Sequence, residues 1–276
     1  MRHRAARLIL SLPTFVLLGN LAFTSTAFAA QEEGAFADKF MFRLASYSID
    51  EADTDIAVFS DDRIGSGFSF ADDLGGDTRV TIPRIDIHYR YNQRHRIDFT
   101  HFKIERDGRQ LLKIDIEVED QTYAVGETVV SDISYELLKV GYAYSFYHSE
   151  AVELSFTAGL NITSYEFNFE LADGSQADSS KASAPLPMIG LRMSYAINPR
   201  WSIHYLSESF FIEPGDKLKG SFLTYELDVQ YKIGKSFILG VGVTRLGIDL
   251  TANDVEWRGR ISDSHRGLSL FVSYYL

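Results

Sequence analysis

Apolar and polar residues alternate with a period of two along most of the chain after residue 38. This is the pattern of β-strands whose two faces meet different surroundings. In one run, Val152, Leu154 and Phe156 alternate with glutamate, serine and threonine, and the alternation recurs in four further runs: 187–196, 223–231, 236–244 and 268–276. No segment shows a convincing helical period, so the sequence predicts an all-β fold.

The strands are long, and aromatic residues gather at their ends. Several alternating runs last about ten residues, whereas soluble strands typically have about 5–6 and membrane-barrel strands need about 9–11. The aromatic pairs are Tyr89 and Tyr91, Tyr144 and Phe146, Tyr195 and Trp201, and Tyr231 and Phe237. An aromatic girdle at a membrane interface has this placement. We therefore expect an antiparallel transmembrane β-barrel.

Short and long connections alternate along the chain. The short turns lie near 92–95, 147–150, 197–200 and 232–235. The long, acidic connections lie around 105–130, 170–183 and 251–264. Bacterial barrels have short periplasmic turns and longer outer loops, so we expect both termini on the periplasmic side.

The turns define four hairpins, and a first and a last strand complete the count. The hairpins pair 79–92 with 95–106, 130–146 with 151–170, 184–196 with 200–212, and 217–231 with 236–250. Strands near 39–49 and 262–276 make ten. Residues 54–60 and 67–71 also have the pattern of short strands. The barrel has twelve strands if they span the membrane and ten if they form an outside hairpin, and we favour twelve. Pro83 indicates a bulge or a strand end, because proline lacks a ladder donor.

Residues 1–30 have the three parts of a secretory signal peptide. Three arginines precede a mostly apolar stretch, Leu8 to Leu21, and Ala27-Phe28-Ala29 is a small-x-small cleavage site. We therefore expect export and a single barrel domain, residues 31–276, in the outer membrane of a Gram-negative cell.

Composition narrows the possible chemistry. The chain has no cysteine, which excludes disulfides, thiolate metal sites and cysteine nucleophiles. Its net charge of −11 argues against a nucleic-acid partner. The mean hydropathy of −0.09 is too polar for a bundle of membrane-spanning helices.

Strand alternation also predicts which side chains point into the barrel. The expected lumen-lining residues are Arg43, Arg84, Asp86, His88, Arg90, Arg96, Asp98, Lys139, Glu153, Arg192, His204, Glu226 and Asp228, with Glu208 and Gln230 beside them. Charges on the lipid face are costly, which favours this inward placement. These charges either line a narrow pore or pair across the lumen and plug it, and strand count alone leaves both readings open.

Catalytic and metal motifs are absent from the sequence. There is no Gly-x-Ser-x-Gly elbow, His-Glu-x-x-His or P-loop, so we assign no catalytic or metal residue and expect no cofactor. The best catalytic candidate is His204 near Glu208 or Glu226, and a satisfied lumen histidine is the simpler interpretation. The acidic clusters at 50–55 and 61–77 do not match a calcium loop.

Two segments carry a resemblance. PRIDIHYRYNQRHRIDFTHF (83–102) and SYELLKVGYAYSFYHSEAVELSFTAGL (134–160), with the acidic stretch Asp72-Asp73-Leu74-Gly75, resemble a porin-like family of proteobacterial outer-membrane β-barrel proteins. The resemblance implies the fold and the location of the protein, and it includes no catalytic motif.

These observations favour an integral outer-membrane barrel, either a small porin-like channel or a structural barrel with a charged lumen. One alternative is an enzyme acting on lipid A, phospholipid or peptide. Another is an adhesion barrel that works through acidic outer loops. The expected partners are outer-membrane lipid and lipopolysaccharide, and the barrel-assembly machinery during insertion.

Overall fold

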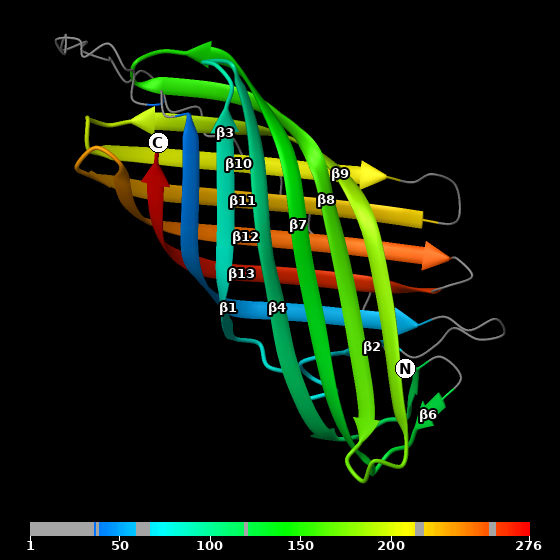
Figure 1. The fold of residues 1–276 in the computed structure, drawn as a ribbon. Helices are drawn as coiled ribbons and strands as arrows, with labels where there is room; N and C mark the ends of the chain where they lie inside the picture. Colours follow the sequence, from blue (N-terminus) through cyan, green and yellow to red (C-terminus); the bar gives the residue numbers. More distant parts are fainter. Residues whose placement is uncertain (1–35, 37–38, 59–66, 119–120, 213–217, 254–257) are drawn as a thin grey trace, which may run out of the picture. The chain divides into compact units, whose positions relative to one another are not determined.

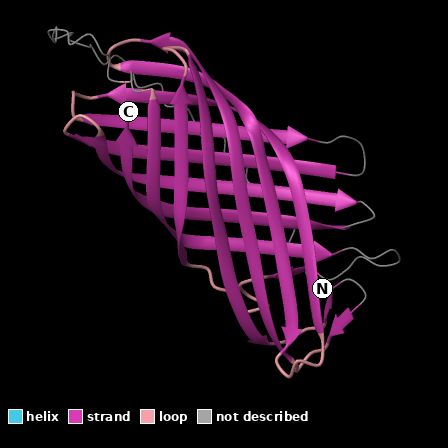
Figure 2. Cartoon of the chain, viewed as in Figure 1, coloured by secondary structure: helices cyan, strands magenta, loops and turns pink. Residues whose placement is uncertain are grey.

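The computed structural model describes residues 36, 39–58, 67–118, 121–212, 218–253 and 258–276 (Figure 1). The predicted signal peptide lies outside these residues. The described secondary structure consists of strands joined by turns (Figure 2). Within these ranges, no helix is long and apolar enough to cross a bilayer.

Ten antiparallel strands form the closed barrel. They are β1 (Phe40–Val58), β3 (Val80–Arg90), β4 (His95–Leu111), β7 (Thr128–His148), β8 (Val152–Leu171), β9 (Ala177–Ala196), β10 (Trp201–Ile212), β11 (Leu218–Ile233), β12 (Phe237–Asn253) and β13 (Arg258–Tyr275). Each pairs with its neighbour in this order, and β13 pairs with β1 to close the ring. The all-β antiparallel barrel is confirmed.

The strand count is the ten-strand alternative, and the favoured count of twelve is wrong. Residues 54–58 continue β1. Residues 67–69 form β2 (Gly67–Ser69), which pairs with the far end of β1 outside the ring. A second small sheet joins β5 (Ile116–Val118) to β6 (Gln121–Tyr123). The short turns lie where the sequence predicts them.

Much of the sequence expected to form long loops is strand instead. β4 runs to Leu111, β9 starts at Ala177 and β13 starts at Arg258. β7 reaches 21 residues and β8 reaches 20, about twice the length that a membrane span requires. The strands therefore continue well past one membrane thickness, away from the short turns.

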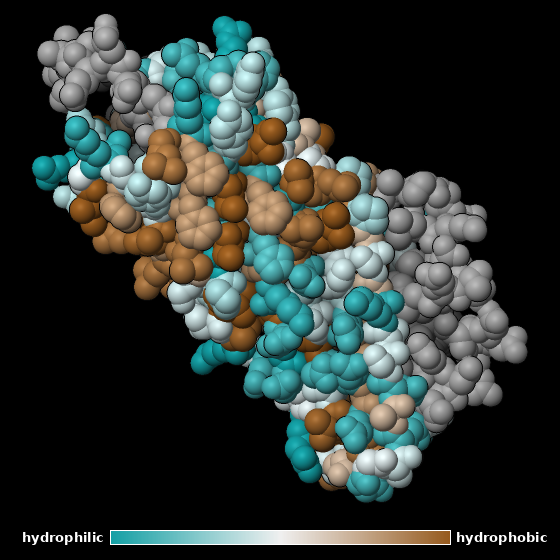
Figure 3. All heavy atoms as spheres, in the orientation of Figure 1, coloured by the Kyte–Doolittle hydropathy of each residue, from teal (hydrophilic) through white to brown (hydrophobic). Residues whose placement is uncertain are grey.

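The outer face divides into two levels. Next to the short turns lies the apolar belt, whose outward residues include Leu44, Ile97, Val140, Leu160, Leu191, Leu227, Val241 and Leu270. Beyond it lies the distal part, whose outward residues include Lys103, Asp132, Glu166, Lys181, Asp249 and Arg260. Figure 3 shows one face of this division as a brown band beside a teal region. The belt has the surface that a bilayer core requires, and the distal part has the surface that water requires.

Strand β8 shows how the sequence encodes this change. Its even-numbered residues point outward and its odd-numbered residues inward along its whole length. From Val152 to Ile162 the apolar residues stand at even positions. From Tyr165 to Leu171 they stand at odd positions. The hydrophobic pattern changes phase while the backbone continues without a bulge, so the apolar side moves from the outer face to the inner one.

In the distal part the barrel separates into two facing sheets. β3 pairs with β4 only up to Arg84 and Phe102, and β9 pairs with β10 only up to Ile189 and Ser209. Beyond these points β4, β7, β8 and β9 continue as one sheet, and β10 to β13 with β1 continue as the other (Figure 1). Pro83 immediately precedes the first stopping point. Pro187 lies two residues from Ile189 at the second, and neither proline has an amide that can donate to a further rung.

The 67–77 segment closes the seam between β3 and β4. The Phe70 amide donates to the Thr54 carbonyl of β1 at 2.9 Å, and the Asp77 amide donates to the Asp107 carbonyl of β4 at 2.9 Å. Gly76 and Gly108 bridge the two sides. A Cβ at Gly76 would lie 2.2 Å from the Phe70 ring, so only glycine allows this close approach.

The space between the distal sheets holds an apolar core. It is built from inward residues of both sheets, of β2 and of the β5–β6 hairpin, including Tyr47, Phe68, Phe102, Ile104, Tyr123, Phe169, Phe222, Ile248 and Ile261. Ring contacts join the two sides, with centroid distances of 5.7 Å between Phe68 and Phe169 and 6.2 Å between Tyr47 and Phe102. The distal part is therefore organised like a soluble β-sandwich.

Candidate functional site

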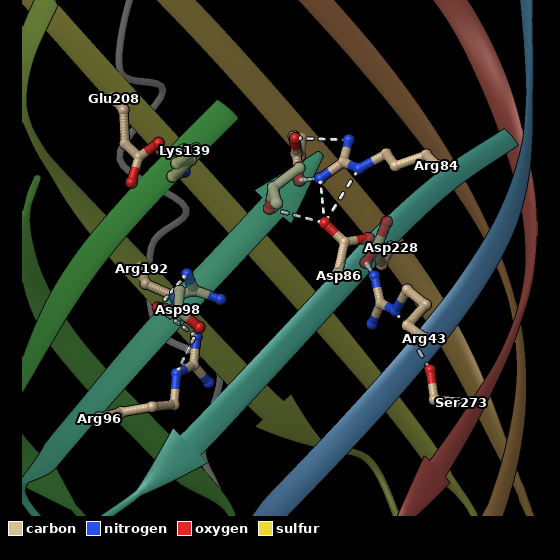
Figure 4. Close-up of polar contacts among 12 residues, drawn as sticks. Arg43, Arg84, Asp86, Arg96, Asp98, Lys139, Arg192, Glu208, Asp228 and Ser273 are labelled. Atoms are coloured by element: carbon tan, nitrogen blue, oxygen red, sulfur yellow. Dashed lines mark hydrogen bonds and ion pairs between the residues drawn. The ribbon is translucent and has the colours of Figure 1, made fainter. Parts of the chain in front are cut away.

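The interior at the level of the belt is a dense layer of charges. The structure places all the predicted lumen-lining residues on the inner face of their strands. Six cations and six carboxylates meet there: Arg43, Arg84, Arg90, Arg96, Lys139 and Arg192 with Asp86, Asp98, Glu153, Glu208, Glu226 and Asp228. Figure 4 shows most of them converging from strands on different sides of the ring. We call this set the ionic layer.

Arg84 links opposite walls of the barrel. From β3 its guanidinium donates to both carboxylate oxygens of Glu226 on β11, at 2.9 and 3.2 Å. It also donates to Asp86 at 3.0 Å, and the same Asp86 oxygen accepts from the Thr100 hydroxyl at 2.7 Å. A bidentate contact between non-neighbouring strands bridges the lumen directly.

Two further ion pairs, Arg90–Glu153 and Arg192–Asp98, also join non-neighbouring strands. Arg90 on β3 holds Glu153 on β8 through two hydrogen bonds of 2.8 and 2.9 Å. Asp98 accepts from Arg192 on β9 at 3.1 Å and lies 3.0 Å from Arg96.

Two further pairs complete the layer. Arg43 donates to Asp228 at 2.8 Å and stacks on the Phe271 ring, while Lys139 pairs with Glu208. With equal numbers of both signs, the ionic layer carries no net charge.

His204 and His88, the predicted lumen histidines, have different surroundings, and His148 near the short turns lies 3.9 Å from Glu153. His204 lies between the hydroxyls of Ser194 and Ser202, each 2.9 Å from one ring nitrogen. The His88 ring packs edge-on against Tyr275, with centroids 5.8 Å apart. The predicted approach of His204 to Glu208 or Glu226 does not appear among its described contacts. This arrangement gives His204 no carboxylate to orient it as a general base.

A small cavity marks the boundary between the ionic layer and the apolar core. Its volume is about 20 Å³, and its walls include Arg84, Lys139, Asn161, Phe222 and His265. Such a space holds about one water molecule and no larger solute. The Asn161 side chain is fully buried there.

The distal core contains a polar cluster that sequence reasoning missed. Asp263 on β13 accepts from the hydroxyls of Tyr165 and Thr54, both at 2.7 Å, and lies 3.0 Å from the His265 Nε2 atom. Arg106 on β4 donates to Thr54 and lies 3.9 Å from Asp263. The sequence does contain a signal, because Asp263 and His265 are two residues apart and therefore share one strand face.

This cluster lies in the distal part, beyond the belt. Burial there opposes ionisation of Asp263, but the nearby His265 and Arg106 and the Tyr165 hydroxyl lower its pKa to about 2. Burial, and after it the same carboxylate, raise the pKa of Tyr165 well above its ordinary value. A neutral tyrosine donating to an ionised aspartate is the stable state of this pair.

The cluster resembles an acid–histidine pair, but it is sealed. The side chains of Asp263 and His265 are at most 1% exposed, and aromatic residues surround them. No group of three or more metal-binding side chains occurs in the part of the chain that the structure describes. The geometry therefore supports a fixed structural network better than a reaction centre.

Comparison with known proteins supports the fold. No protein-family model matches the chain, and no curated protein matches it in sequence. Among solved structures, the outer membrane protease OmpT from Escherichia coli aligns with a TM-score of 0.59 at 10% identity, covering 87% of this chain and 97% of that one. At this identity the likeness establishes the fold alone.

Further matches are also outer-membrane barrels, at lower similarity. OprG from Pseudomonas aeruginosa aligns with a TM-score of 0.39 at 11% identity, covering 87% of this chain and 96% of that one. The attachment invasion locus protein Ail of Yersinia pestis, in complex with a heparin analogue, aligns at 0.31 and 11%, covering 83% and 98%. A shared fold does not by itself select among functions.

Proposed function

We propose that this protein is an integral outer-membrane β-barrel whose interior is closed by its own side chains. In this proposal the chain is exported by the signal at residues 1–30, and the short turns and both termini face the periplasm. The belt spans the membrane, and the distal part stands outside it. The protein then works as a structural barrel that presents a folded two-sheet platform at the cell surface.

The observation that carries this proposal is the cross-lumen pairing of the ionic layer. A conducting pore needs hydrated space along its axis, whereas here Arg84 reaches Glu226 on a non-neighbouring strand and Arg90 reaches Glu153. Ten strands lie near the size at which side chains fill a barrel. Above this layer, the apolar core fills the space between the distal sheets.

The distal exterior is the natural surface for recognition in this proposal. Its outward residues are polar and include Asp132, Glu136, Glu166 and Lys181, and they project from paired strands. Strands hold such side chains in a fixed array. An adhesion role would therefore use this array rather than the acidic loops that the sequence suggested.

Single-channel recording in planar bilayers tests the closed interior. The refolded protein is expected to insert without discrete conductance across a range of voltages and salts. Heat-modifiable gel mobility of the same preparation is the control for a folded barrel. Reproducible conductance steps from a heat-modifiable sample would contradict the closed interior and restore the porin-like alternative.

A further inference from the structure

Two of the short turns have the same local design. Asn92-Gln93-Arg94-His95 joins β3 to β4, and Asn198-Pro199-Arg200-Trp201 joins β9 to β10. In each turn the asparagine Oδ1 accepts from two backbone amides, at 2.9 Å from the arginine and at 3.0 Å from the residue after it. An asparagine that bonds its own backbone in this way fixes the position of the following arginine.

Each arginine then lies against a tyrosine of the neighbouring strand. Arg94 approaches the Tyr144 hydroxyl at 3.4 Å, and Arg200 approaches the Tyr231 hydroxyl at 3.4 Å. The carbonyl of each arginine also accepts a backbone hydrogen bond of 2.8 Å from the residue after that tyrosine. The same arginine–tyrosine clamp therefore occurs at two separate places on the rim formed by the short turns.

The clamps differ from the arginines of the ionic layer in their partners. Among the described contacts, neither Arg94 nor Arg200 pairs with a carboxylate, and both are exposed. A planar guanidinium with unused donors beside a hydroxyl, at the edge of an apolar surface, suits a phosphate group. An aromatic ring follows each arginine, and the rings of Trp201 and Tyr231 lie 4.8 Å apart.

The second clamp lines a pocket with a further cation. The pocket has a volume of about 350 Å³, and Pro199, Arg200, Tyr231 and Lys232 form most of its wall. Among the described residues, the other charged side chains near the short turns are Lys39 and Lys235, against Glu150. The described side chains of this rim are therefore mainly basic, although the whole chain is strongly acidic.

We propose that the two arginine–tyrosine clamps bind the phosphate groups of anionic phospholipids in the membrane leaflet next to the short turns. The acyl chains of a bound lipid would lie along the belt, and the glycerol phosphate would meet Arg94 or Arg200. This inference rests on the proposed membrane location of the belt.

Lipid retention measured by native mass spectrometry tests the clamps. The protein, refolded in detergent, is offered equal amounts of phosphatidylglycerol and phosphatidylcholine. The unsubstituted protein is expected to retain phosphatidylglycerol preferentially. In the R94Q/R200Q variant the bound phosphatidylglycerol is expected to fall about threefold to tenfold, as for the loss of a charge-assisted hydrogen bond that solvent partly screens. The matched control R79Q removes an exposed arginine that immediately precedes β3, at the end away from the short turns, and is expected to retain lipid normally.

Three results would overturn the proposal. They are equal retention of the two lipids, unchanged retention in R94Q/R200Q, and displacement by millimolar inorganic phosphate, which would indicate a site for free phosphate. If the double variant does not fold, R94Q and R200Q are measured singly and each must reduce retention. Loss of heat-modifiable mobility in the unsubstituted protein would instead contradict the barrel itself, so the two failures are distinguishable.

Discussion

The belt level and the distal part of this barrel have opposite polarity. At the belt, leucine, valine and phenylalanine face outward and the interior holds the ionic layer. In the distal part, acids and lysines face outward and the interior holds tyrosine, phenylalanine and isoleucine. The same strands pass through both levels, so the polarity of the inner and outer faces reverses along one continuous backbone.

The comparison shows that the surrounding medium, rather than the strand, decides where apolar residues go. Lipid accepts an apolar exterior, and the inward charges can then be satisfied only by each other. Water outside the distal part restores the ordinary arrangement of a buried apolar core. The boundary lies between Ile162 and Tyr165 on β8, where the hydrophobic phase changes.

The largest expected effect comes from unpairing the ionic layer. Arg84→Met leaves the buried Asp86 and the partly buried Glu226 without their partner, which is expected to cost about 3–5 kcal/mol of unfolding free energy. Urea unfolding of the protein in lipid vesicles measures this.

The matched control for this variant removes the charges together. R84M/D86L/E226M replaces the whole group by apolar side chains and is expected to stay within about 1 kcal/mol of the unsubstituted protein. Equal stability of the single and triple variants would show that pairing is not what holds this layer.

A smaller effect should separate the two outer faces. Leu160 and Ser164 both point outward from β8, one in the belt and the other just beyond it. Leu160→Arg is expected to cost about 2–4 kcal/mol, because the charge would face lipid. Ser164→Arg is expected to change the stability by about 0.5 kcal/mol or less. The same unfolding assay compares them, and equal costs would mean that the belt ends elsewhere.

The smallest effect concerns acid stability of the distal core. The pKa of Asp263 is about 2 in the folded protein, below its ordinary value of 3.8. Asp263 therefore contributes about 2 kcal/mol above pH 4, and this contribution is lost as the pH falls through 4 toward 2. Unfolding measured from pH 6 to pH 2 should show Asp263→Asn less stable at pH 6, with the difference shrinking below pH 4. A difference that does not vary with pH would assign the effect to packing.

Alternation was enough to predict the barrel and the four short turns. It could not predict strand ends in the distal part, because 105–130 and 170–183 are acidic and acidic segments are typical of loops. The inward residues of the strands that lead into these segments, such as Ile104, Tyr165 and Phe169, carry the missing information as a change of phase. The pairing partners within the ionic layer could not be predicted either. Arg84 and Glu226 lie on strands that are far apart in the sequence, and the distance between them depends on how the ring closes.

The seam between β9 and β10 has a consequence for self-association. From Ala177 to Met188, one edge of β9 has no strand partner among the described residues. An unpaired edge is a template on which a second chain can add a strand and begin aggregation. β9 carries Pro185, Pro187 and Lys181 in this stretch, and serine and alanine make up much of the rest. The prolines lack backbone donors, the lysine is charged and the small side chains bury little area, so all three disfavour the addition of a strand from a second chain. The seam can therefore stay open in water without recruiting another copy.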